Sequence, residues 1–143
     1  MSIKNIWFDI TNTPHVHFLL SIKKILEDDN YSFSYSAREF SETIKLLEKF
    51  VNKEDMKIIN TNYGKNYAAK VKYLLNRFNQ IRKSGIKYDL SISCGSEGAI
   101  WNSWLKGKKS IAFGDNDTAR QWTYGYMVNY AFFPDSISRK ILE

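Results

Sequence analysis

The stretch IKNIWFDITNTPHVHFLL, residues 3–20, decides the fold class. Residues 3–10 form a short apolar run rich in side chains that favour β-strands, so they predict a strand. Thr13 and Pro14 follow directly, and they predict the N-cap and first position of a helix that runs to about residue 29. Its inner face is expected to carry four apolar residues at helical spacing: Val16, Leu19, Leu20 and Leu26. The stretch therefore predicts the strand and helix of a β-α-β unit.

The same alternation continues to the end of the chain. Further strands are expected at residues 31–36, 56–60, 88–93, 110–113 and 130–133. Helices are expected between them and again at residues 118–129. Strict alternation with short loops implies a mostly parallel sheet covered by helices on both faces, a Rossmann-like three-layer α/β fold. We expect the strand order 3-2-1-4-5, with right-handed crossovers.

The second predicted helix begins at a capping motif. Ser36 and Glu39 have the serine-to-glutamate spacing of a capping box. One face of this helix is expected to carry Phe40, Ile44, Leu47 and Val51.

Composition limits the class of protein. The chain has 143 residues, which corresponds to one domain and is too short for a (β/α)₈ barrel. Its one cysteine, Cys94, excludes an internal disulfide and a thiolate-only metal site, and we expect it to be a buried strand-end residue. The chain shows neither a cleavage signal nor an apolar run long enough to span a membrane, so a cytoplasmic location is expected.

Basic residues are concentrated in one segment. Residues 56–88 contain no Asp or Glu but eight Lys or Arg, more than the net charge of +6 for the whole chain. The segment includes an expected amphipathic helix within residues 65–87, with a basic outer face. That face is either simply solvated or a contact with an anionic membrane or a phosphorylated ligand. No recognition-helix or base-stacking motif accompanies the charge, so nucleic acid is not expected as a partner. If this face contacts a membrane, charge reversal at Lys70, Arg77 and Lys83 is expected to abolish binding to anionic vesicles.

Several cofactor motifs are missing. The turn after the first strand contains no glycine, so the dinucleotide fingerprint is absent, and no Walker A sequence occurs. No cofactor is therefore expected. His15 and His17 point about 200° apart on a helix, which disfavours a shared metal ion. The run 115–117 (Asp-Asn-Asp) is better explained as a helix cap or hydroxyl-binding turn than as a metal site.

Ligands of parallel sheets bind at the carboxyl ends of the strands. This rule selects the loops 9–17, 94–98 and 114–120, where the polar residues of the chain gather. His15 is our candidate general base, although a purely helix-capping histidine is the alternative. The other expected ligand-binding residues are Asp9, Thr11, Asn12, His17, Ser96, Glu97, Asp115 and Asn116.

Two blocks of sequence resemble the opening of domain-of-unknown-function family 354: residues 6–18 (IWFDITNTPHVHF) and residues 37–43 (AREFSET). Residues 93–96 and 113–117 also resemble this family. The family is similar to GT-B glycosyltransferases, and its N-terminal half resembles that of the enzyme that adds N-acetylglucosamine to undecaprenyl-linked muramyl peptide. Pro14 departs from that pattern, because the transferases have glycine there.

The resemblance implies one domain over residues 1–143 that corresponds to the acceptor side of a GT-B enzyme. The partners it implies are a donor-binding domain or subunit and a glycan acceptor, which is lipid-linked if the basic helix contacts a membrane. The donor domain is expected to be missing, so the isolated chain is expected to be inactive. A sugar-nucleotide epimerase and a non-catalytic scaffold are the alternatives.

Overall fold

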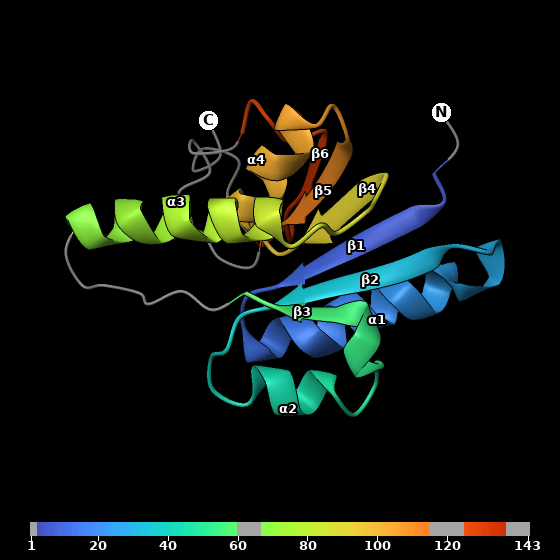
Figure 1. Cartoon of the computed structure of the whole chain (residues 1–143). Helices are drawn as coiled ribbons and strands as arrows, with labels where there is room; N and C mark the ends of the chain where they lie inside the picture. The colour runs from blue at the N-terminus through green and yellow to red at the C-terminus, as the bar shows by residue number, and fades with distance from the viewer. Residues whose placement is uncertain (1–2, 60–66, 115–124, 137–143) are drawn as a thin grey trace.

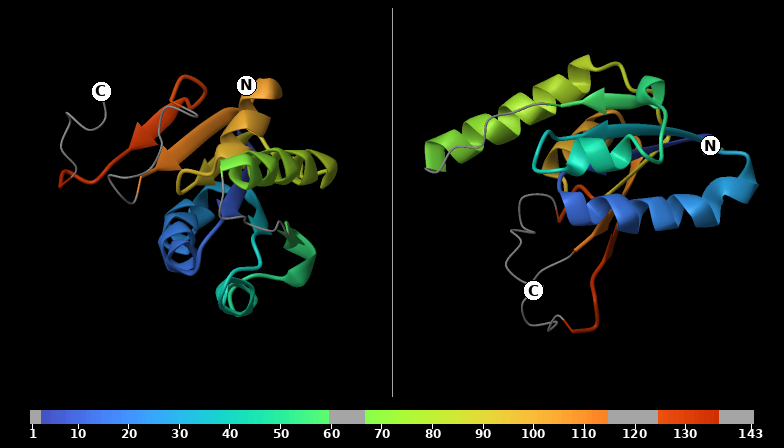
Figure 2. Two further views of the ribbon diagram at one scale, coloured as in Figure 1. Left: turned by 90° about the vertical axis from the view of Figure 1, so that its left-hand side faces the viewer. Right: turned by 90° about the horizontal axis from the view of Figure 1, so that it is seen from below.

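A computed structural model describes residues 3–59, 67–114 and 125–136 of the chain. Six parallel strands form one sheet in the order β3-β2-β1-β4-β5-β6. Their bounds are Asn5–Ile10 (β1), Ser32–Ala37 (β2), Met56–Ile58 (β3), Leu90–Ser93 (β4), Lys109–Phe113 (β5) and Tyr130–Phe132 (β6). Figure 2 shows β3 and β6 at opposite edges. The predicted Rossmann-like fold and the order 3-2-1-4-5 are confirmed, with β6 beyond β5.

Helices cover both faces of the sheet (Figure 1). The α-helices are α1 (Thr13–Leu26), α2 (Thr43–Leu47), α3 (Tyr67–Lys83) and α4 (Glu97–Leu105). Helices α1 and α2 lie on one face, and α3 and α4 lie on the other. Two 3₁₀ turns, Glu27–Asp29 and Lys53–Asp55, follow α1 and precede β3.

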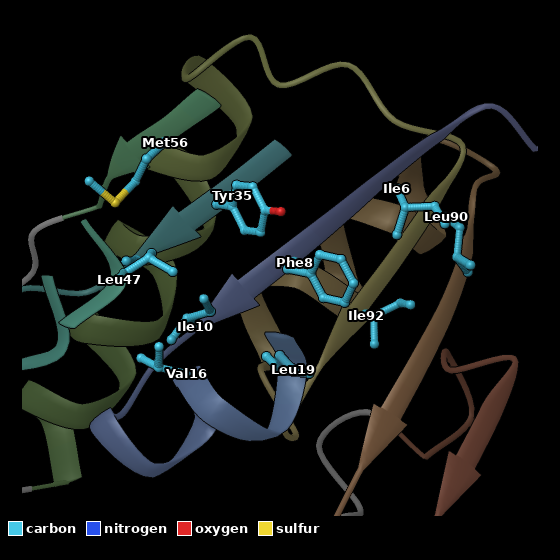
Figure 3. Packing of buried hydrophobic residues seen from close by; sticks show 11 residues of the cluster. Ile6, Phe8, Ile10, Val16, Leu19, Tyr35, Leu47, Met56, Leu90 and Ile92 are labelled. Atoms are coloured by element: carbon cyan, nitrogen blue, oxygen red, sulfur yellow. The ribbon is translucent and has the colours of Figure 1, made fainter. Parts of the chain in front are cut away.

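Strand β1 is the centre of both cores, because successive side chains of a strand point to opposite faces. Ile6, Phe8 and Ile10 point toward α1 and pack against Val16 and Leu19 (Figure 3). All five of these side chains have at most 1% of their surface exposed. A strand that is buried on both faces carries apolar side chains at successive positions, as Ile6, Trp7 and Phe8 do here, and this run made the strand recognisable from the sequence.

The opposite face is centred on Trp7, which packs in a cluster with Ile81 and Ala99. Helix α4 approaches α3 closely at Gly98. A Cβ atom at Gly98 would lie 2.9 Å from Cδ1 of Ile81 and 3.4 Å from Cγ of Arg77. The glycine therefore serves helix packing.

The capping box predicted at Ser36 is wrong. Ser36 is the fifth residue of β2, and its hydroxyl is engaged with residues of β1 instead of a helix amide. Helix α2 starts only at Thr43, after Ser41 has adopted a positive φ of 50°. A tertiary hydrogen bond has thus overridden a local capping signal, and Phe40 and Val51 lie outside the short helix.

Two other helix boundaries differ from the prediction. Asn12, one residue before the predicted Thr13, is the N-cap of α1, and its side-chain oxygen accepts from the Thr13 amide. The helix expected at residues 118–129 lies partly outside the described residues, and the described part, 125–129, is not helical but contains a turn at residues 125–127.

Helix α3 is amphipathic, but its basic face differs from the prediction. Arg77 is 2% exposed and lies on the inner face, and Lys70 is half-buried. The exposed face combines apolar, polar and basic side chains: Val71, Lys72, Leu75, Asn76, Asn79, Arg82 and Lys83. The N-terminal part of α3 extends beyond the carboxyl ends of the strands (Figure 1). Among residues 3–59, 67–114 and 125–136, no helix combines the length and the hydropathy needed to cross a bilayer.

Candidate functional site

A pocket of about 530 Å³ lies at the carboxyl edge of the sheet. It is formed where the segments that follow β1, β4, β5 and β6 converge. We call it the carboxyl-edge pocket. The described residues that line it are Pro14, His15, Phe18, Cys94, Phe113, Gly114, Phe132, Phe133 and Pro134. Parallel α/β sheets usually bind ligands at this edge. The volume is within the range of about 300–1,000 Å³ that is typical of small-molecule sites.

His15 enters this pocket from the first turn of α1. Asn12 caps the helix, and the Asn12 carbonyl accepts a hydrogen bond of 3.1 Å from the His15 amide. The side chain is buried, with 7% of its surface exposed. Its Nδ1 atom lies 3.2 Å from Oγ1 of Thr11, so the ring orientation is fixed by a neighbour in the same loop.

Aromatic rings form much of the pocket wall. The rings of Phe18 and Phe113 meet edge to face at a centroid distance of 5.1 Å. Phe113 also stacks on Phe132, with centroids 5.3 Å apart. Gly114 permits the placement of Phe133, because a Cβ atom there would lie 2.2 Å from the Phe133 ring. These contacts make the wall predominantly apolar.

Asp9 lies on the other face of the sheet and has no exposed surface. Oδ1 of its carboxylate accepts hydrogen bonds from the Ser36 hydroxyl and from Nη2 of Arg77, the latter at 2.7 Å. Oδ2 accepts from the Ser96 hydroxyl. Ser36 in turn accepts from the indole nitrogen of Trp7 at 2.8 Å. We call these five residues the Asp9 cluster; they join β1, β2, α3 and the start of α4.

The charge on Arg77 is maintained by this arrangement. Burial acts to lower the pKa of the guanidinium, but the charge and hydrogen bond of Asp9 outweigh it, so the pKa is raised. The carboxylate of Glu97 acts in the same direction. Nη1 also donates to the Ile59 carbonyl at 3.4 Å. A buried charge needs such a set of partners, because leaving it unpaired is costly.

The predicted site residues are divided between several places. His15 lies in the pocket, and Thr11 positions its ring. Asp9 and Ser96 belong to the buried Asp9 cluster, and Asn12 is used as a helix cap. His17 is exposed and packs edge to face on Phe50, with ring centroids 5.8 Å apart, so the two histidine rings diverge. Glu97 is half-buried in the first turn of α4. Asp115 and Asn116 lie outside the described residues.

Some residues near the site were missed by the sequence analysis. Arg77 was assigned to the outer face, although it is spaced between Leu74 and Ile81 on the apolar stripe of α3. Cys94 was expected to be buried, and it is half-buried at the pocket wall. The phenylalanines of the pocket wall carried no local signal, because they converge only through the tertiary fold.

The chemistry available in the pocket is that of an imidazole in apolar surroundings. A histidine in this setting can accept a proton from a hydroxyl group or donate a hydrogen bond to it. Within the described ranges, no group of three His, Cys, Asp or Glu side chains is placed to hold a metal ion.

The family model "Protein of unknown function (DUF354)" matches residues 4–93, more than half of the chain. The chain belongs to this family. No curated protein matches it.

Two solved structures share the fold of this DUF354 protein. One is a Listeria monocytogenes protein assigned as a UDP-N-acetylglucosamine 2-epimerase, with a TM-score of 0.62, 14% identity and coverage of 99% of this chain and 42% of that one. The other is Phytolacca americana UGT2, solved with UDP-2-fluoro-glucose and pterostilbene. Its TM-score is 0.53 at 12% identity, and the match covers 80% of this chain and 31% of that one. The chain thus spans less than half the length of either structure, and these likenesses establish a GT-B-like fold.

Proposed function

We propose that the chain is the acceptor-binding domain of a GT-B-type glycosyltransferase. The observation that carries this proposal is His15, which is held by Thr11 inside a pocket at the carboxyl edge of a GT-B-like sheet. In the proposed reaction, His15 accepts the proton of an acceptor hydroxyl as the oxygen attacks the anomeric carbon of the donor sugar. The bond between this carbon and the diphosphate of the donor breaks, and the nucleoside diphosphate leaves. A general base of this kind contributes about 10²- to 10⁴-fold to the rate.

The donor sugar is bound by a second domain or a partner subunit in this proposal. The chain spans 42% of the epimerase chain and 31% of the transferase chain, which leaves room for such a domain in proteins of this fold. Holding two substrates in reactive orientation can lower the activation barrier by up to about 7–11 kcal/mol. One wall of a cleft cannot hold both substrates in this way. We therefore expect residues 1–143 alone to show neither binding of nucleotide sugars nor turnover.

The test combines the chain with the product of the continuing or adjacent reading frame. Turnover and donor binding are expected in the combined protein, measured by acceptor-dependent release of nucleotide and by calorimetry. His15→Ala should lower turnover by about 10²- to 10⁴-fold and leave donor affinity nearly unchanged. His17→Ala, a control on the same helix that lies outside the pocket, should retain turnover. Micromolar donor binding by the isolated chain would contradict the proposal.

An epimerase-like role is the second candidate, favoured by the Listeria monocytogenes structure that covers 99% of the chain. An epimerase converts a sugar nucleotide without any acceptor, so the two candidates differ in one observable. Conversion of the sugar nucleotide in the absence of acceptor would favour the epimerase. If His15→Ala changes only stability, a non-catalytic scaffold is favoured instead.

We further propose that the exposed face of α3 contacts an anionic membrane when the acceptor is lipid-linked. This face carries Val71 and Leu75 beside three exposed basic residues, Lys72, Arg82 and Lys83. Apolar and basic side chains together favour binding at the interface of an anionic bilayer. The electrostatic attraction contributes about 1 kcal/mol of binding free energy per basic residue near the surface.

Co-sedimentation with anionic vesicles should be observed and should weaken with salt. Reversal of the three exposed charges should abolish it. Arg77 is unsuitable for this test because it is buried in the Asp9 cluster. Equal binding to neutral vesicles would argue for a merely solvated face.

A further inference from the structure

The carboxyl-edge pocket has a composition that restricts its ligand. Its described lining contains four phenylalanines and two prolines but no lysine, arginine, aspartate or glutamate. Burying a charged group without a partner is unfavourable, so the described part of the wall favours an uncharged ligand against it. The polar side chains at the wall are the His15 imidazole and the Cys94 thiol.

The arrangement of the rings favours a flat ligand. Phe113 stacks nearly parallel to Phe132, at an interplanar angle of 21°, and meets Phe18 at 77°. The three rings therefore offer both faces and edges to a ligand in the pocket. Aromatic rings prefer offset-stacked or edge-to-face neighbours, and each such pair adds to the gain from burial alone.

Part of the phenylalanine wall is exposed. Phe132 is 52% exposed and Phe18 is 44% exposed, although both contact the mostly sheltered Phe113. A planar ligand bound there would cover apolar surface that the described chain leaves open to water. Burial of apolar surface is the main favourable term for such a ligand.

We propose that the carboxyl-edge pocket binds an uncharged aromatic hydroxyl compound, with its ring against the phenylalanine wall and its hydroxyl at His15. The proposal deepens the proposed function, because this hydroxyl is then the acceptor group of the transfer. The binding itself requires neither a donor nor a second domain.

The test uses 2-naphthol as the probe and residues 1–143 as the protein. The imidazole NMR signals report the site directly, because the chain has only two histidines. Addition of 2-naphthol should shift the signals of His15 and leave those of His17 in place. The probe should also slow the reaction of Cys94, the only cysteine, with a thiol-reactive dye.

Matched variants distinguish the contribution of the ligand's ring to binding from that of its hydroxyl group. Phe132→Ala should weaken binding about 10-fold, whereas Phe50→Ala should not weaken it; Phe50 is 53% exposed and lies outside the pocket lining. His15→Leu should weaken the binding of 2-naphthol roughly 2- to 10-fold and leave the binding of naphthalene unchanged.

Three outcomes would overturn the proposal. These are the absence of 2-naphthol binding, equal shifts at both histidines, and tighter binding of farnesol, which would indicate an isoprenoid site. Naphthol binding at His15 without transfer by the combined protein would refute the proposed function and leave this pocket assignment intact.

Discussion

The Asp9 cluster lies at the end of β1 and the carboxyl-edge pocket just after it, yet the two regions differ in polarity and in exposure to solvent. Asp9 points toward α3 and α4 and is surrounded by hydroxyl, indole and guanidinium donors. His15, six residues later, enters from α1 on the opposite face among phenylalanines. One region is closed and polar, whereas the other is open and mostly apolar.

This difference separates stability from binding. The Asp9 cluster ties two strands to α3 and α4, and its charges are fully buried, so a change there is expected to affect folding. The pocket has few polar contacts to lose and an exposed wall, so a change there is expected to affect ligands first.

Removing one charge of the Asp9 cluster should have the largest effect. Arg77→Met leaves the Asp9 carboxylate buried without its cation and should lower the free energy of unfolding by about 3–5 kcal/mol. Arg82→Met, on the exposed face of the same helix, should change it by less than about 0.5 kcal/mol. Urea denaturation measures both. Equal effects of the two substitutions would mean that Arg77 is not paired inside the protein.

A double variant provides a control for this result. Asp9→Asn combined with Arg77→Met removes both charges, so its cost should be clearly smaller than the sum of the two single costs. Simple additivity would indicate that the two groups do not interact.

A smaller effect is expected at the close contact between Gly114 and Phe133 in the pocket wall. Gly114→Ala places a methyl group where the Phe133 ring lies and should cost about 1–3 kcal/mol. In a Phe133→Ala background the same substitution should cost little, because the ring is gone. An unchanged cost in that background would show that the clash lies elsewhere.

The smallest effect on stability is expected at Asp89, which lies where the strands begin, at the opposite end of the sheet from the pocket. Hydrogen bonds from Lys108 and from the amides of Lys4 and Asn5 lower the pKa of Asp89 from its ordinary value of 3.8 to about 2. A lowered pKa stabilises the folded state above the ordinary value, and this contribution is lost as the pH falls from about 4 to 2.

Asp89→Asn should therefore flatten the stability profile in that pH range and change nothing in the binding of 2-naphthol. Urea denaturation as a function of pH is the measurement. An acid limb identical to that of the unmodified chain would contradict the assigned cause.

The strands and their order were predictable because each buried strand is a short apolar run between clear turn signals. Gly85, with a φ of 71°, is one such turn signal, and it lies just past the end of α3 and before β4. The capping box at Ser36 misled because a local pattern does not reveal a partner 27 residues away in β1. The rule for parallel sheets selected the loops of the site, and His15 from the first of these loops lines the pocket. Its role as a base stays a prediction. The ring wall formed by Phe113 and Phe132 depends on strand pairing, which no local pattern encodes.

Arg77 shows where charge counting fails. Arg77 was assigned to the basic outer face of the predicted helix, although its spacing from Leu74 and Ile81 already placed it on the apolar stripe. Asp9, an acid inside an otherwise apolar strand, required a buried partner. Combining these two observations would have predicted the ion pair from the sequence.

The division between the two regions is tested most directly by measuring unfolding and 2-naphthol binding on the same pair of variants. Ser36→Ala, a mild change in the Asp9 cluster, should lower the free energy of unfolding by about 1–3 kcal/mol and leave the Kd within about twofold. His15→Leu should weaken binding roughly 2- to 10-fold and change the free energy of unfolding by less than about 1 kcal/mol. If Ser36→Ala weakens binding as much as His15→Leu does, the two regions form one site and the account is contradicted.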